Sequence, residues 1–286
     1  MLTVKTLVLL LLLGCYNIET KIDGIGYSLS YKQVGAAATP DKIVPIEGAP
    51  FEIPQLKRPV FPDFTINIEE KGAKTNIPIT SIVNQTIEEI SQKGGGTVII
   101  PKGKWKSGRI VLKSNVNLHL AEGSEIEFPG NAEDYLPAVF TRHEGIEIMG
   151  SGSFIYANGE DNIAITGKGV IYGPSLDAEI RQRPNGNTVV EKDILDNAPV
   201  EKRVFDGMDG RGFYKPKTIS PINCTNVLIE GITMERSTFW NVCPIYCENV
   251  IIRGITVNSI GIPSGDGIDI ESCKNVLIEY CTLNCG

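Results

Sequence analysis

Histidine and positive charge are scarce in this sequence, and long apolar runs are nearly absent. Only two histidines, His119 and His143, occur among the 286 residues, which excludes a metal site built from several histidines. The 34 acidic residues outnumber the 27 basic ones, so a protein that binds nucleic acid over its whole surface is also excluded. The single apolar run, residues 7–13, is too short to span a bilayer, which excludes a polytopic membrane protein.

Glycine, valine and isoleucine are abundant. The chain has 30 glycines, above a background of about 7%, whereas aromatic residues make up only 7%. A hydrophobic content of 42% excludes a disordered chain. This composition indicates an all-β protein with frequent tight turns.

The first 15 residues have the pattern of an export signal. Lys5 supplies positive charge ahead of the apolar run, and Gly14 and Cys15 follow that run at once. A small residue followed by cysteine at this place resembles a bacterial lipobox, in which the cysteine is lipidated and becomes the new N-terminus. Ordinary signal cleavage, with Cys15 as a bystander, is the alternative. We expect an exported protein, an outer-membrane lipoprotein or a periplasmic protein, that meets the membrane only through this anchor.

A proline-rich segment and one helix precede the main part of the chain. In residues 16–63 prolines recur every few residues, and because proline lacks the N–H group that a central strand needs, we predict an irregular tether or surface arm. Apolar residues then recur at helical spacing over residues 79–90, and three glycines follow. We predict a helix that caps the open end of a β region, followed by a strand over residues 97–101.

An internal repeat dominates the rest of the sequence. Segments that start at Cys224, Cys247 and Cys273 share the pattern Cys-x-Asn-Val-[Leu/Ile]-Ile, and weaker copies lie at 115–120 and 162–167. A unit of roughly 22 to 26 residues with very short strands cannot enclose a core alone, but stacked units can. The repeat therefore predicts a right-handed parallel β-helix over residues 64–286, in preference to a leucine-rich repeat or a β-sandwich.

The repeated asparagines and cysteines occupy equivalent places in successive units. Asn226, Asn249 and Asn275 would line one corner of the coils, where stacked amides hydrogen-bond along the axis. The cysteines would line up as small buried residues, so we expect free thiols rather than the disulfides that an exported chain can form.

Three carboxylates fall within six residues ahead of the third repeat. Strand alternation puts Ile268 and Ile270 in the core. It turns Asp269 and Glu271 outward. Asp266 has the parity of the buried isoleucines, but the glycine on each side can bend the backbone and turn it out. On this pattern, Asp266 is either a catalytic acid or base on the outer face of a coil or part of an ordinary Asp-Gly turn.

The segment around Asp266 resembles the first catalytic motif of glycoside hydrolase family 28, the polygalacturonases and their relatives. Residues 264–269, Ser-Gly-Asp-Gly-Ile-Asp, match the family pattern Asn-Thr-Asp-Gly-[Ile/Phe]-Asp, often Asn-Gly-Asp-Gly-Ile-Asp in bacterial members. Further segments resemble the family at residues 94–103, 112–120, 134–137, 163–169 and 239–244. The resemblance covers about residues 60–286.

The resemblance implies a pectin-lyase-like right-handed β-helix that degrades cell-wall pectin by inverting hydrolysis of α-1,4-linked galacturonate, with no metal or other cofactor. Such hydrolysis needs one carboxylic acid to protonate the leaving oxygen and one carboxylate to activate water. Among three family aspartates, Asp266 matches one that helps to activate water. Asp269 matches a further family aspartate and is interpreted as a supporting residue. Pectic polysaccharide or an oligogalacturonide is the implied partner.

The sequence departs from the family in ways that affect activity. The family's Asp-Asp pair, which includes the general acid, begins where this chain reads Cys285-Gly286, and its histidine and Arg-x-Lys pair follow later. Ser264 replaces the usual asparagine, and Cys243 stands where relatives often have histidine. We therefore expect a C-terminally truncated β-helix, the N-terminal part of a family member, that is inactive or nearly so by itself.

For several other residues the sequence allows two interpretations, one functional and one structural. Trp240 either stacks on a sugar or is buried between coils, and Lys215, where relatives carry a basic residue before proline, either binds a galacturonate carboxylate or is a solvated charge. The two histidines have no partner motif and are interpreted as structural or surface residues. Residues 174–216 interrupt the repeat as an insertion that either walls a cleft or is disordered.

Two other functions stay open on the sequence. A polysaccharide lyase on the same kind of coil would use acidic calcium ligands, which Asp266, Asp269 and Glu271 could imitate. A non-catalytic surface solenoid that binds glycan belongs to a different class. Loss of activity on chelation would favour the lyase, and turnover of polygalacturonate would favour the hydrolase.

Overall fold

A computed structural model describes residues 39–43, 45, 48, 50 and 54–285 of the chain. The expected signal with Cys15, and most of the expected arm, lie outside these residues. Within them, none of the helices has the length and the apolar character needed to cross a bilayer.

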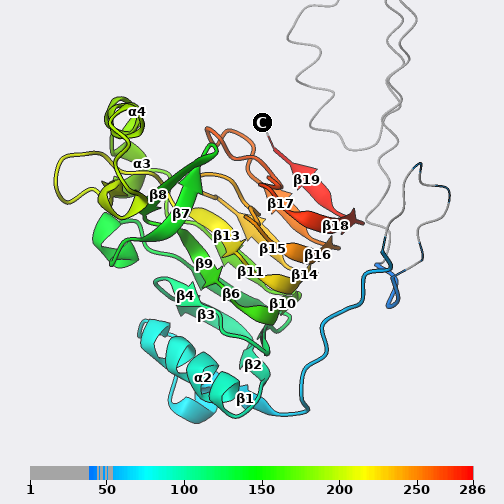
Figure 1. The fold of residues 1–286 in the computed structure, drawn as a ribbon. Helices are drawn as coiled ribbons and strands as arrows, with labels where there is room; N and C mark the ends of the chain where they lie inside the picture. Colours follow the sequence, from blue (N-terminus) through cyan, green and yellow to red (C-terminus); the bar gives the residue numbers. More distant parts are fainter. Residues whose placement is uncertain (1–38, 44, 46–47, 49, 51–53, 286) are drawn as a thin grey trace, which may run out of the picture. The chain divides into compact units, whose positions relative to one another are not determined.

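Short strands wind coil upon coil through three parallel sheets and form a right-handed parallel β-helix (Figure 1). Sheet A consists of β1 (Thr65–Asn67), β2 (Gly96–Ile100), β5 (Val116–Leu120), β10 (Asp161–Gly167), β14 (Thr225–Glu230), β16 (Glu248–Arg253) and β18 (Lys274–Glu279). Sheet B consists of β3 (Gly103–Lys106), β6 (Ser124–Glu127), β11 (Val170–Tyr172), β15 (Thr233–Glu235), β17 (Thr256–Asn258) and β19 (Thr282–Asn284). Sheet C consists of β4 (Ile110–Val111), β9 (Ser153–Asn158) and β13 (Lys217–Ile222), and single parallel bridges extend it to the later coils.

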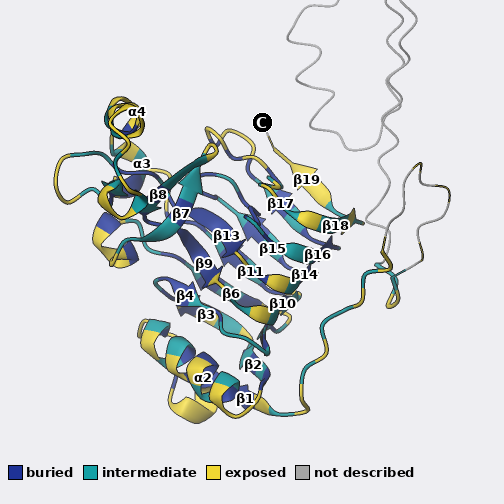
Figure 2. Ribbon diagram, viewed as in Figure 1, coloured by how far each residue is buried: buried dark blue, intermediate teal, exposed yellow. Residues whose placement is uncertain are grey.

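The predicted repeat is confirmed, because its three aligned segments are the neighbouring strands β14, β16 and β18, and the two weaker copies are β5 and β10. Equivalent residues stack in register: Val227 pairs with Val250, which pairs with Val276. These side chains join one apolar core that runs through the coils. Figure 2 shows buried residues along the central strands and exposed ones along β19, whose three residues are all exposed.

Asparagines form the predicted ladder at the corner before sheet A. Asn249 Nδ2 donates to Asn226 Oδ1 at 3.3 Å, and Asn275 Nδ2 donates to Asn249 Oδ1 at 3.0 Å. All three have a positive φ between 54° and 58°, a left-handed conformation that asparagine tolerates better than most residues. The ladder therefore joins successive coils where the chain turns from sheet C into sheet A.

Replacing Asn249 by alanine should lower the free energy of unfolding by about 1–3 kcal/mol, because both neighbouring amides lose a partner and a Cβ stays in the left-handed region. Urea denaturation measures this loss. Asn249→Gly is the matched variant, since it removes the same amide but accepts the positive φ. Equal losses for both variants would show that backbone conformation contributes nothing here, and no loss for either would contradict the ladder's role.

Helix α2 (Thr80–Gln92) closes the N-terminal end of the stack, as the apolar spacing predicts (Figure 1). Its residues Val83, Ile87 and Ile90 are fully buried in the core. The expected strand after the glycines is β2. Gly96 at its start has a φ of +149°, and a Cβ atom added there would lie only 2.2 Å from the carbonyl oxygen of Phe64, so the position requires glycine. A short 3-10 helix, Ile68–Lys71, precedes α2.

The insertion at residues 174–216 is folded, so the alternative of a disordered segment is wrong. It contains α3 (Glu179–Gln182), α4 (Asn187–Leu195), a 3-10 helix (Val200–Lys202) and β12 (Val204–Phe205). Strand β12 pairs with β8 (Ile146–Gly150), which forms an antiparallel hairpin with β7 (Val139–His143). A further 3-10 helix, Ala132–Tyr135, precedes this hairpin. The insertion and the β7–β8 hairpin pack together through a small apolar cluster that is separate from the main core.

The described part of the proline-rich segment lies on the outer face of sheet A. Leu56 and Phe61 pack against a separate apolar cluster formed by Ala164, Leu228 and Ile251, which point away from the main core. In addition, a guanidinium nitrogen of Arg58 donates to Glu230 Oε1 at 2.6 Å. This stretch therefore covers apolar side chains that three successive strands would otherwise expose to water.

Candidate functional site

The carboxylate-rich segment 264–271 lies at the end of sheet C, beside the coil that contains Trp240 and Cys243. Asp269 N donates to Val242 O at 2.8 Å, and Val242 N donates to Gly267 O at 3.1 Å. Asp266 is exposed, as an outward orientation requires, although it lies on the last described coil, where Ile270 is exposed too. The catalytic role of Asp266 stays a prediction.

The backbone around Asp266 is held by a residue that the sequence analysis missed. Asn241 is fully buried, and its Nδ2 lies 3.0 Å from Asp266 O and 3.3 Å from Gly265 O. Ser264, which replaces the family's asparagine, has a φ of +53°, the region that asparagine favours. The only signal for Asn241 in the sequence is its place beside Trp240 in a segment that resembles the family.

Asp269 is half-buried rather than fully outward. Its Oδ2 is buried without a hydrogen-bond partner among the described residues. Burial, with the charges of Asp266 and Glu271, raises the pKa of Asp269 to about 7, and Lys217 opposes the shift. A carboxyl group in this state exchanges its proton near neutral pH.

The expected burial of Ile270 is wrong, because this residue is 37% exposed. Its counterpart one coil earlier, Pro244, is buried. Ile270 belongs to the last described coil, on which no further described strand stacks, whereas Ile268 pairs with Val242 and packs against the core.

Lys217 also lies in this site, and the sequence analysis did not single it out. The side chain is 3% exposed, and Nζ donates a hydrogen bond to the carbonyl oxygen of Arg142. Burial lowers the pKa of Lys217, whereas Cys243, Glu271 and Asp269 raise it. A lysine at the start of a strand whose six residues are all buried is the signal that could have identified it.

Aromatic side chains surround this lysine. Its Nζ lies 5.5 Å from the ring centroid of Trp240 and 6.0 Å from that of Phe239, and the two rings stack at 4.9 Å. Trp240 is therefore part of the site, and it is half-buried.

His143 stacks on Tyr214, with 3.8 Å between the ring centroids. Burial, and to a smaller extent the charge of Lys217, lowers the pKa of His143 to about 4. This histidine is neutral at pH 7 and packs as a ring, in keeping with a structural role.

The β7–β8 hairpin binds the coil that carries the carboxylates. Gly145 N donates to Glu271 Oε1 at 3.1 Å, and Arg142 Nη1 donates to Ser272 Oγ at 3.1 Å. The hairpin therefore forms a wall beside the outer face of sheet C.

The other predicted site residues do not join this cluster. Lys215 is half-buried, and both burial and the nearby cation Arg181 lower its pKa, while none of the carboxylates around Asp266 acts on it. Cys15 lies outside the described residues.

The repeated cysteines are free thiols in the described part of the chain, as expected, and Cys224 and Cys247 are buried.

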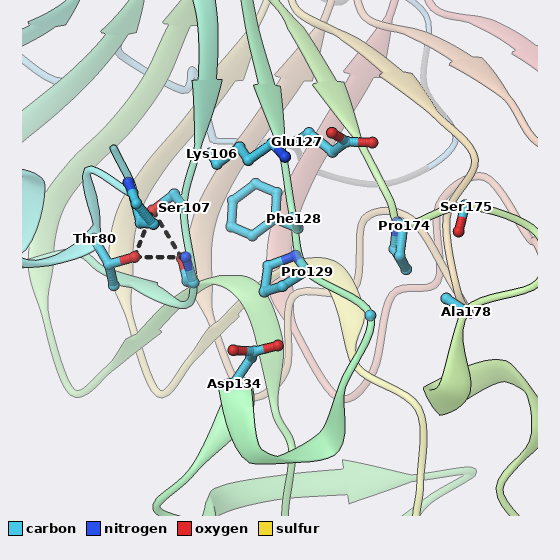
Figure 3. Close-up of a pocket in the computed structure, with 13 residues that line it drawn as sticks. Thr80, Lys106, Ser107, Glu127, Phe128, Pro129, Asp134, Pro174, Ser175 and Ala178 are labelled. Atoms are coloured by element: carbon cyan, nitrogen blue, oxygen red, sulfur yellow. Dashed lines mark hydrogen bonds between the residues drawn. The ribbon is translucent and has the colours of Figure 1, made fainter. Parts of the chain in front are cut away.

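A cavity of about 520 Å³ lies elsewhere, between the start of α2 and the segments that follow β3, β6 and β11 (Figure 3). Its charged residues are Lys106, Glu127 and Asp134, and Thr80 Oγ1 accepts a hydrogen bond from Gly108 N at 2.6 Å. None of the residues around Asp266 lines it. We therefore place the candidate site on sheet C, where the perturbed carboxyl group is, and not in this cavity.

Comparison with known proteins identifies exopolygalacturonases as similar proteins, although no protein-family model matches the chain. It is 36% identical to a hyperthermoactive exopolygalacturonase from Thermotoga maritima, with a TM-score of 0.73 over 80% of this chain and 54% of that one. It is 25% identical to a family 28 exopolygalacturonase from Yersinia enterocolitica, with a TM-score of 0.60 over 77% of this chain and 43% of that one. It is also 24% identical to an exo-poly-alpha-D-galacturonosidase from Dickeya chrysanthemi, over 77% of this chain and 40% of that protein.

These similarities confirm the resemblance to glycoside hydrolase family 28 and the right-handed parallel β-helix. The chain spans about half the length of these relatives.

Proposed function

We propose that this chain is part of a glycoside hydrolase that cleaves the α-1,4-linked galacturonate of pectic polysaccharide with inversion at the outer face of sheet C. Without the Asp pair that the resemblance places after Cys285, the 286 residues should show little or no turnover. The observation that carries the proposal is the exposed carboxylate of Asp266, within a family 28 motif and on a coil similar to those of exopolygalacturonases. We propose further that the chain is exported with a lipid on Cys15, since a pectic polymer is met outside the cell.

Asp266 is assigned to the activation of water. An inverting hydrolase holds its two carboxyl groups about 6.5–9.5 Å apart, so that a water molecule fits between one of them and the sugar. The exposed position of Asp266 leaves its oxygen atoms open to such a water. Asp269 supports it from the half-buried position next to Lys217, and the general acid belongs to the Asp pair that the resemblance places after Cys285.

The β7–β8 hairpin supports attack at a chain end. It is fixed to the coil of Asp266 through Gly145 and Arg142, and a hairpin held there would limit how far a polymer can extend past Asp266. The similar proteins named above are exo-acting, which agrees with this arrangement.

Binding and turnover of galacturonate oligomers test the proposal. By calorimetry, trigalacturonate should bind, whereas a neutral galactose trimer should not, because the substrate class is defined by its carboxylates. With a chain extended through the Asp pair that the resemblance implies, chromatography of the products from polygalacturonate should show short saturated products from the first minutes, as exo attack requires. The 286-residue chain should release little or none. The affinity reports on the site even where turnover is below detection.

Three outcomes would overturn the proposal. Unsaturated products that disappear on chelation would identify a lyase. A broad mixture of oligomers would contradict exo attack. Binding of other glycans, with none of galacturonate oligomers, would identify a glycan-binding solenoid.

A further inference from the structure

We propose that Asn241 is a positioning residue of this site: together with Ser259, it holds the main-chain carbonyl groups of Gly265 and Asp266 and so fixes where the Asp266 side chain leaves the coil. The inference deepens the proposed function, on which its link to the reaction rests. The hydrogen bonds themselves belong to the fold and do not depend on any substrate.

Asp266 lies in a loop between strand β17 and Ile268, the residue that bridges to Val242 on the coil before. Within this loop, Gly265 N donates to Ile262 O at 3.0 Å. A local turn of this kind fixes the shape of the loop but not its place on the coil. The direction of the Asp266 side chain therefore depends on contacts with neighbouring segments.

Asn241 supplies such contacts from the coil before. Its backbone N donates to Asp266 O at 2.9 Å, and its Nδ2 lies 3.0 Å from the same oxygen and 3.3 Å from Gly265 O. Nδ2 also lies 3.2 Å from Ser237 Oγ, and both of these side chains are buried. The two N–H donors of one buried amide are thus shared among three acceptors, two of which are successive carbonyl groups of the loop.

A second donor, Ser259, comes from the same coil as Asp266. Its Oγ donates to Gly265 O, and its backbone N donates to Asn284 O at 2.9 Å. Gly265 is also tightly packed, because an added Cβ would lie 2.9 Å from Ile262 O and 3.0 Å from Ser259 Cβ. The loop is therefore held at two carbonyl groups, with little free space at residue 265.

These hydrogen bonds hold the main chain and leave the carboxylate of Asp266 free. They end on carbonyl oxygen atoms, while Asp266 is exposed. A general base must lie within hydrogen-bond reach of the proton that it takes. A displacement of about 1 Å can lower a rate by about 10². An anchored backbone that carries a free carboxylate meets this requirement.

Replacing Asn241 by alanine should speed the hydrogen exchange of Gly265 N by about tenfold or more, because the loop loses the hydrogen bonds of Nδ2. NMR of the full chain measures exchange at this single amide. Asn84→Ala is the matched control, since the Asn84 amide also binds main chain, donating to Arg109 O at 2.9 Å and accepting from Val111 N at 2.8 Å. The control should destabilise the chain without a selective change in the loop.

In a chain extended through the Asp pair that the resemblance implies, Asn241→Ala should lower the rate of galacturonate release by about 10². The same substitution should cause little further loss beside Asp266→Asn, because Asn241 acts through the base that is then absent. Equal losses in both backgrounds would reduce Asn241 to a general structural role and overturn the inference. Unchanged exchange of Gly265 N, or a faster exchange with an unchanged rate, would overturn it as well.

Should Asn241→Ala not fold, Ser259→Ala tests the same arrangement. It removes a hydroxyl group that donates to Gly265 O and leaves the amide of Asn241 in place. Both the exchange and the rate should change in the same direction, to a smaller degree, and a variant that changes neither would contradict the inference.

The two proposals fail separately. Faster exchange of the loop in Asn241→Ala, with no galacturonate released by the extended wild-type chain, would leave the hold on the loop intact and remove the assigned reaction. Galacturonate release at the wild-type rate by Asn241→Ala, with exchange of the loop unchanged, would do the reverse.

Discussion

Replacing Arg253 by methionine is expected to destabilise the fold by about 3–5 kcal/mol, because it leaves the partly buried carboxylate of Glu279 without a partner and leaves Glu230 with Arg58 alone. The Arg253 side chain is fully buried at the end of β16. Its Nε donates to Glu279 Oε1 at 2.7 Å and its Nη1 to Glu230 Oε1 at 3.0 Å, while Nη2 donates to Pro40 O at 2.7 Å. One guanidinium therefore joins three successive strands of sheet A to the segment that crosses them.

Urea denaturation of wild type and Arg253→Met measures this effect. Lys274→Met is again the control: its ion pair with Glu248 is largely exposed, so its loss should change stability by less than about 1 kcal/mol. The double variant Arg253→Met, Glu279→Gln should recover part of the loss, since it removes the unpaired carboxylate of Glu279 and leaves Glu230 paired with Arg58. An Arg253→Met variant as stable as the control would show that water reaches these carboxylates.

The coils could be predicted from the sequence because the interactions that define them recur at a fixed spacing. Asn226, Asn249 and Asn275 each turn the chain in the same left-handed conformation, and Asn249 and Asn275 each donate a hydrogen bond to the amide of the unit before them. A repeat of that kind is visible without any knowledge of distant contacts. The hairpin is different. Ile148 lies in the same apolar cluster as Phe205, which is far along the chain and outside the repeat, so no periodic pattern in the sequence predicts the hairpin.

The site was predictable only in part, for a related reason. Glycines beside Asp266 allowed its exposure to be expected. The raised pKa of Asp269 reflects burial and the charges of Asp266, Glu271 and Lys217, and Lys217 belongs to a strand about 50 residues earlier in the chain. Alternation also misplaced Ile270, because its burial requires a further strand stacked upon it, whereas parity describes only the direction of a side chain.

In a chain extended through the Asp pair that the resemblance implies, replacing Asp266 by asparagine is expected to lower the rate of galacturonate release by about 10²–10⁴, the usual contribution of a general base. Asparagine has the shape of aspartate but cannot take a proton from water. The surrounding backbone should persist, because Asn241 holds the carbonyl group of residue 266 and not its side chain. Affinity for trigalacturonate should be equal or higher, since a negative charge beside an anionic substrate is removed.

Rate and affinity must be measured together to separate the roles that Asp266 can have. Glu248→Gln is the control, because it neutralises a carboxylate on sheet A, away from the site. A rate that falls while affinity holds assigns Asp266 to the chemical step, since the lost interaction is one made only in the transition state. A fall in affinity as large as the fall in rate would instead make Asp266 a binding residue, and an unchanged rate would move the base to another carboxyl group, with Asp269 the first to replace.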